Sequence, residues 1–147
     1  AYAATTKGVM RTQSASFDYT DWSAANTTVN LDTGIDLPSG AYLFGIRINL
    51  TTLFDDGTTF ATVSLSCGTT SGSEDNLFSE NIDVSLSAGA TGYYEGMNTN
   101  SGADGFGQTY QNVLGASRNL SLELDCSVNT DTLTQGELLV DYLILEP

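Results

Sequence analysis

The chain has 147 residues and a formal net charge of -14, because 18 Asp and Glu oppose four Lys and Arg, and it contains no His. That length suits one domain with a two-layer core, and the negative charge argues against nucleic acid or an anionic membrane surface as a main partner. Without His the chain lacks the commonest general base and a main transition-metal ligand, so we do not expect an enzyme.

The N-terminal segment is basic and precedes an acidic body, because residues 1–17 contain Lys7 and Arg11 and no acidic residue. We expect residues 1–20 to form an arm that could include a first strand, and residues 21–147 to form a single domain. Two interpretations of the charge stay open. The arm is either a short solvated terminus or a contact element that lies on the acidic face of a neighbouring subunit.

Alternating apolar residues predict two strands after a short one at residues 28–31. Every second side chain is apolar in residues 42–51 and again in residues 59–67, which is the pattern of half-buried strands. We expect these two strands to pair as a hairpin with its turn at residues 53–58. Gly57 marks the tip, because Gly adopts positive φ without steric cost.

Acidic residues in two loops could hold calcium through oxygen ligands. Asp55 and Asp56 lie in the expected turn, and Glu74 and Asp75 lie in the Gly/Ser/Thr-rich loop that follows. Neither loop has the spaced DxDxDG pattern of a calcium loop. The alternative is that all four are solvated turn carboxylates and that the protein binds no cofactor.

A Gly-rich stretch over residues 88–107 follows a strand expected at residues 82–86. It is longer than ordinary connections and carries aromatic residues, so we interpret it as a binding loop. Four aromatic residues could form a stacking platform for sugar rings: Trp22, Tyr93, Tyr94 and Tyr110. The same side chains could instead cap the core or lie at a subunit interface.

Two further strands are expected at residues 119–128 and 137–146. The second is apolar on both faces, as a central strand or one that faces another subunit would be. Cys67 and Cys126 fall at apolar strand positions, so we expect two buried thiols; a disulfide would need adjacent strands with Cα atoms within roughly 7 Å. Seven to eight strands without an amphipathic helix predict an all-β fold, an antiparallel, jelly-roll-like β-sandwich.

Residues 33–54 read TGIDLPSGAYLFGIRINLTTLF and contain an LP-x-G-A entry and a G-x-R-I-N-x-T strand. Residues 62–68, TVSLSCG, form a V-x-L-x-x-G strand, and the last strand follows an L-T-x-G turn at residues 133–136. In these motifs the chain from about residue 33 to residue 147 resembles small virion proteins of tailed bacteriophages, of the capsid decoration or cement type.

The resemblance implies a protein that is fixed to the outside of a phage head and is assembled there in the host cytoplasm. Its partners would be the major capsid protein or other virion subunits, and its copies would form a homo-oligomer, with a trimer favoured. We expect its protein contacts at the following residues: Lys7, Arg11, Trp22, Tyr93 and Tyr94. The alternative is a carbohydrate-binding or host-attachment module of a tail or fibre.

Overall fold

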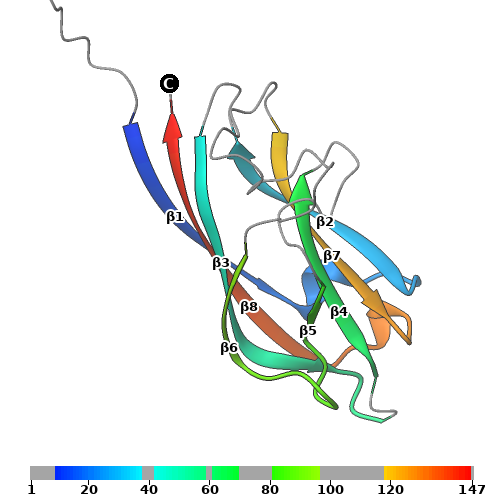
Figure 1. Cartoon of the computed structure of the whole chain (residues 1–147). Coiled ribbons are helices and arrows are strands. Elements are labelled where there is room, and N and C mark those ends of the chain that lie inside the picture. The colour runs from blue at the N-terminus through cyan, green and yellow to red at the C-terminus, as the bar shows by residue number, and fades with distance from the viewer. Residues whose placement is uncertain (1–8, 38–41, 59–60, 70–80, 97–117, 147) are drawn as a thin grey trace, which may run out of the picture.

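The computed structural model describes residues 9–37, 42–58, 61–69, 81–96 and 118–146, and they form two four-stranded antiparallel sheets packed face to face (Figure 1). Sheet A has the order β1 (Val9–Asp18), β8 (Gln135–Glu146), β3 (Tyr42–Asp55) and β6 (Gly92–Gly96). Sheet B has the order β2 (Thr28–Leu37), β7 (Arg118–Cys126), β4 (Val63–Thr69) and β5 (Ile82–Asp83). Eight strands in this order are a jelly roll, so the predicted all-β sandwich is confirmed.

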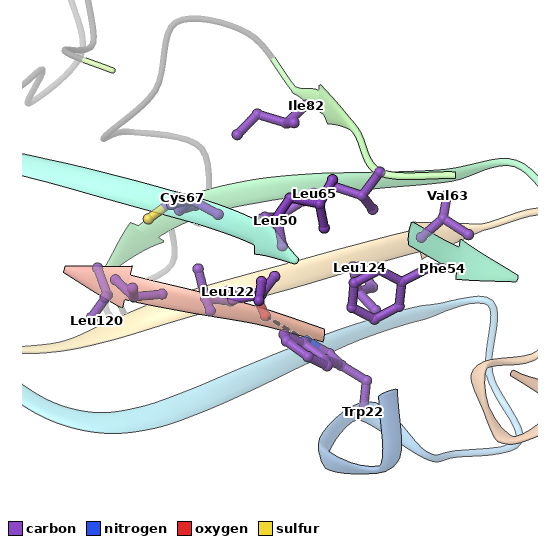
Figure 2. Close-up of a cluster of buried hydrophobic side chains, with 14 of the residues drawn as sticks. Trp22, Leu50, Phe54, Val63, Leu65, Cys67, Ile82, Leu120, Leu122 and Leu124 are labelled. Atoms are coloured by element: carbon purple, nitrogen blue, oxygen red, sulfur yellow. Dashed lines mark hydrogen bonds between the residues drawn. The ribbon is translucent and has the colours of Figure 1, made fainter. Parts of the chain in front are cut away.

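The core lies between the sheets and is made by the apolar positions that alternate along the strands. In β3, Ile46, Ile48 and Leu50 are buried while Arg47 and Thr51 are exposed. Sheet B supplies the facing layer, in which the largest fully buried side chains are Leu65, Leu120, Leu122 and Leu124 (Figure 2). Neither sheet could shield its apolar face alone, so each strand is stabilised mainly by packing across the gap.

The predicted hairpin between residues 42–51 and 59–67 is wrong. Strand β3 pairs with β6 and β8, whereas β4 pairs with β5 and β7 in the opposite sheet. The connection between them therefore crosses from one layer to the other, and β3 continues through the residues expected as a turn to Asp55. Gly57 does adopt positive φ, at 79°, as expected. The alternation identified the buried face of each strand but contains no information on which strand lies beside it.

Part of the expected binding loop at residues 88–107 is strand. Residues 92–96 form β6, the edge strand of sheet A, and pair with β3 from Ile46 to Leu50. Tyr94 lies on the inner side of β6 and packs against the core, which ties this short strand to the sandwich. Residues 97–107 lie outside the described residues.

Strand β8 is central, which explains its apolar character on both faces. It lies between β1 and β3 and buries Leu138, Val140 and Ile144 toward sheet B. Its other side chains, among them Leu139 and Leu143, point to the outer face of sheet A and are partly exposed. Of the two sequence interpretations of this strand, the central position is the one confirmed.

Trp22 closes one end of the core. It lies in a 3₁₀ turn (Tyr19–Trp22), and its side chain is 0% exposed. The indole Nε1 donates a hydrogen bond of 3.0 Å to the carbonyl oxygen of Leu122, drawn as a dashed line in Figure 2. The ring makes edge contacts with Phe17 and Phe54, at centroid distances of 6.3 and 5.8 Å. A large apolar side chain with its polar atom satisfied is a stable core element.

The turn that carries Trp22 is held by a second 3₁₀ turn, Thr130–Thr132. The Thr130 side chain is fully buried, and its hydroxyl donates to the carbonyl oxygens of Trp22 at 2.6 Å and Ala24 at 3.0 Å. The same hydroxyl accepts from the Ala24 backbone N–H at 3.1 Å. Two connections far apart in the sequence are thereby joined beneath the core.

The two cysteines are free and buried, as expected. Their strands are adjacent, but Cys126 lies opposite Val63 and Cys67 lies opposite Leu122, so the thiols are offset along the ladder. Burial raises the pKa of the Cys67 thiol, and burial together with the Asp125 charge raises the pKa of the Cys126 thiol to about 11. Both are therefore neutral at physiological pH and weakly reactive.

In the described part of the chain, no helix is long and apolar enough to cross a membrane.

Candidate functional site

A row of polar side chains crosses all four strands on the outer face of sheet A. The strand registers place Ser14 of β1 beside Asp141 of β8, Asp141 beside Arg47 of β3, and Arg47 beside Glu95 of β6. The Ser14 hydroxyl donates to Asp141 Oδ1. Arg47 donates to Asp141 Oδ2 from Nη2 at 2.9 Å and from Nε at 3.3 Å, and its guanidinium carbon lies 4.5 Å from the ring centroid of Tyr93. The row is therefore a linked hydrogen-bond network with a cation–π contact at one end.

The network keeps its central charges ionised and paired. The Ser14 hydroxyl, and then the Arg47 guanidinium, lower the pKa of the Asp141 carboxyl below its usual value of 3.8. The same hydrogen bond raises the pKa of Arg47. Paired in this way, the Arg47 and Asp141 charges cancel in the middle of the face.

Asp141→Asn is expected to make stability less dependent on pH in the acid range. Because the folded pKa of Asp141 is lowered, its carboxylate stabilises the fold above the unfolded-state pKa near 3.8, and this contribution is lost as pH falls through the folded pKa. At pH 7 the variant should unfold at a slightly lower urea concentration than the wild type, since the pair is partly exposed. Urea titrations at several pH values should show the gap closing on acidification. A gap that stays constant through the acid range would contradict the assignment.

The outer face of sheet A also has apolar side chains and a hollow. Met10 is 53% exposed at the start of β1, and Leu139, Leu143 and Leu145 of β8 are partly exposed beside it. The hollow has a volume of about 860 Å³, and its outer-face lining comes from Thr12, Ser14, Gly45, Arg47, Glu95, Asp141 and Leu143. Gly45 has open space where a side chain would stand, with no heavy atom within 4 Å of a built Cβ. The face thus combines exposed apolar side chains with a depression.

The outer face of sheet B has the opposite character. It presents five carboxylates from β2, β5 and β7: Asp32, Asp36, Asp83, Glu123 and Asp125. Among the side chains that the structure describes there, none is basic. Three of the carboxylates accept hydrogen bonds from neighbouring polar side chains, Asp125 from Thr28, Asp32 from Asn119 and Asp83 from Ser85. The outer face of sheet A is less acidic, because Asp18, Glu95, Glu137 and Asp141 are accompanied there by Arg47.

The expected contact residues do not form one site. Lys7 lies outside the described residues, and Arg11 is a partly buried residue of β1. Trp22 is buried, so it is not part of a surface platform in this fold. Tyr94 is partly buried and donates its hydroxyl to the Ala90 carbonyl oxygen at 2.6 Å. Tyr93 is 63% exposed and lies in the polar row of sheet A.

The calcium candidates are only partly described. Asp55 and Asp56 are 5% and 7% exposed, so they are not solvated turn residues, and they accept hydrogen bonds from the backbone N–H groups of Gly57 and Thr58 at 3.0 and 3.1 Å. Among the described residues no group of three or more His, Cys, Asp or Glu is placed to hold a metal ion. Glu74 and Asp75 lie outside those residues, so calcium binding stays a sequence prediction.

The Arg47–Asp141 pair was not identified from the sequence. The alternation of β3 does place Arg47 on the polar side of its strand, which is the available signal. Its partner lies 94 residues later, on a strand whose own pattern is apolar on both faces. Only the register between β3 and β8 brings the two together.

No protein-family model matches the chain, and no curated protein matches its sequence. The fold is similar to chains in solved structures. One is in the acidic stable capsid structure of Helicobacter pylori bacteriophage KHP30, with 16% identity, a TM-score of 0.59 and coverage of 97% of this chain and 91% of that chain. Another is in the cyanophage Pam1 capsid asymmetric unit, with 19% identity, a TM-score of 0.59 and coverage of 100% and 91%. A third is in the capsid of Ralstonia phage GP4, with 16% identity, a TM-score of 0.50 and coverage of 93% and 85%.

Proposed function

We propose that the protein is a structural component of a phage virion that decorates the outside of the assembled head and stabilises it. The observation that carries this proposal is the likeness of almost the whole chain to chains from three phage capsid structures, with TM-scores of 0.50–0.59. The likeness is one of fold, and function depends on the surface that a fold presents. The surface described above is consistent with adhesion, because one broad face exposes a group of apolar side chains and pairs its central charges.

Such a protein would act by binding energy alone. Any molecule that binds the assembled shell more tightly than its separated subunits stabilises the shell by linkage. Many copies on a symmetric shell would add their individual contributions, and a homo-oligomer, for which a trimer remains the expectation, would bind at several points at once. The proposed partners are the major capsid protein or other virion subunits, and no catalytic step is involved.

The carbohydrate-binding alternative has less support. It depended on a platform of four aromatic rings, of which Trp22 is buried, Tyr94 is partly buried and Tyr110 lies outside the described residues. Tyr93 is exposed, but its ring is covered on one face by Arg47. We therefore do not propose sugar binding.

The test of the proposal is binding to heads that lack the protein. Purified protein should co-sediment with such heads to a saturating ratio, and decorated heads should be disrupted at a higher temperature than bare ones. An unrelated protein of similar size and negative charge is the control for nonspecific adsorption. Protein that stays in the supernatant at every concentration, with no change in head stability, would refute the proposal.

A further inference from the structure

The two broad faces of the sandwich differ in what it would cost to bury them. A docking face must give up its water, and burying an ionised group without a partner weakens binding strongly. The outer face of sheet B would bury five carboxylates with no described basic side chain on the same face. The outer face of sheet A carries four carboxylates, those of Asp18, Glu95, Glu137 and Asp141, and the described basic side chain of Arg47, which pairs with Asp141 at 2.9 Å. Sheet A therefore has the smaller excess of negative charge to dehydrate.

The outer face of sheet A is also the more apolar of the two. Its central strand contributes Leu139, Leu143 and Leu145, and its edge strands contribute Met10 and the exposed ring of Tyr93. Interface cores are enriched in Met and aromatic residues and depleted in acidic ones. The corresponding positions of sheet B are occupied by Asp, Glu, Asn, Ser and Thr. The composition of the two faces thus agrees with the charge argument.

The size of the face fits a specific protein contact. Strands about 4.8 Å apart with a rise of about 3.3 Å per residue give a projected area on the order of 500 Å² per partner, or about 1,000 Å² in total. This reaches the lower limit for a biological interface before the walls of the hollow are added. The hollow at Gly45 favours a partner with a protruding element over a second copy of the same face, because two facing hollows would enclose an unfilled space.

We infer that the outer face of sheet A is the surface that docks on the shell, with the hollow receiving a protruding element of a shell subunit. The acidic outer face of sheet B then points to solvent, where it keeps decorated particles apart by charge repulsion. This inference rests on the proposed function and adds to it the face that makes the contact.

The test compares substitutions matched in chemistry and placed on opposite faces. Leu143→Asp adds a carboxylate to the outer face of sheet A, and Asn30→Asp adds one to that of sheet B. Thr12→Arg places a bulky side chain at the hollow, and Thr28→Arg places it on the exposed edge strand of sheet B. Each variant is first shown by circular dichroism and thermal melting to be folded. The partly exposed Leu143 and the exposed Thr12 then serve as independent probes of the same face.

Binding is measured by co-sedimentation with heads that lack the protein. The two sheet A variants should bind at least about tenfold more weakly than wild type, as is usual for a charge or bulk placed in a buried contact. The two sheet B variants should stay within about twofold, as expected for exposed surface. If the wild type binds heads and the sheet A variants saturate them equally well, the inference is overturned while the proposed function stays intact. Sheet A variants that lose self-association in sedimentation velocity but still bind heads normally would also overturn it, since the face would then join copies of the chain.

Discussion

Trp22→Ala is expected to lower the free energy of unfolding by about 3–5 kcal/mol, the usual cost of removing a fully buried aromatic side chain. The indole packs between Phe17 and Phe54 and donates to the Leu122 carbonyl oxygen, so its removal leaves a cavity and breaks that hydrogen bond. Urea or guanidinium unfolding followed by circular dichroism gives the measurement. Fluorescence is unsuitable, because Trp22 is the single tryptophan of the chain.

Two companion variants make this result specific to the buried indole. Trp22→Phe keeps an aromatic ring but removes the N–H donor, so its loss should be smaller than that of Trp22→Ala. Tyr93→Ala removes an aromatic ring that is 63% exposed and should change stability by roughly 0.5 kcal/mol or less. If Trp22→Ala and Tyr93→Ala had equal small effects, Trp22 would not be part of the core.

Gly136→Ala is expected to destabilise the fold by at least about 2 kcal/mol, an unusually large cost for adding one methyl group. Gly136 has φ of 142°, a conformation that side-chain-bearing residues rarely adopt. A Cβ at this position would lie 2.2 to 2.6 Å from three ring atoms of Phe54, which is itself fully buried. The ring cannot move away without disturbing its contact with Trp22. Equilibrium unfolding in urea provides the measurement.

The matched control for this substitution lies in the same sheet. Gly45→Ala adds the same methyl group where a built Cβ meets no heavy atom within 4 Å, so it should be nearly neutral for stability. A second control is Gly136→Ala made in a Phe54→Leu background. Its cost should be lower there than in the wild type, because two residues in contact have non-additive effects. Equal costs in both backgrounds would show that the contact with Phe54 is not the cause.

The layer structure was predictable because strand patterning reports burial directly. In β3, the period of two correctly selects Ile46, Ile48 and Leu50 as core residues, and the absence of an amphipathic helix leaves a sandwich as the expected architecture. The same pattern is silent on pairing, and β3 and β4 were placed side by side although they belong to opposite sheets. Two strands that follow each other in the sequence with matching apolar faces can pair as a hairpin or face each other across a core.

The candidate site was less predictable because it is created by register. Arg47 and Asp141 lie on neighbouring strands, but their proximity depends on how β3 and β8 align.

Trp22 shows a second limit of prediction from sequence, which concerns the direction of a side chain at the end of a strand. An aromatic residue near the end of a strand can cap the core or project into solvent, and here the capping 3₁₀ turn that begins after Asp18 directs the indole inward. Local sequence does not distinguish these outcomes, since both leave the same pattern of neighbours.

The most direct measurement is a cryo-EM map of heads incubated with the protein, compared with a map of the same heads without it. We expect additional density on the outer surface at symmetry-related positions, into which the two four-stranded sheets fit with sheet A toward the shell. Identical maps of the two samples, or additional density confined to the inside of the shell, would contradict a decorating role.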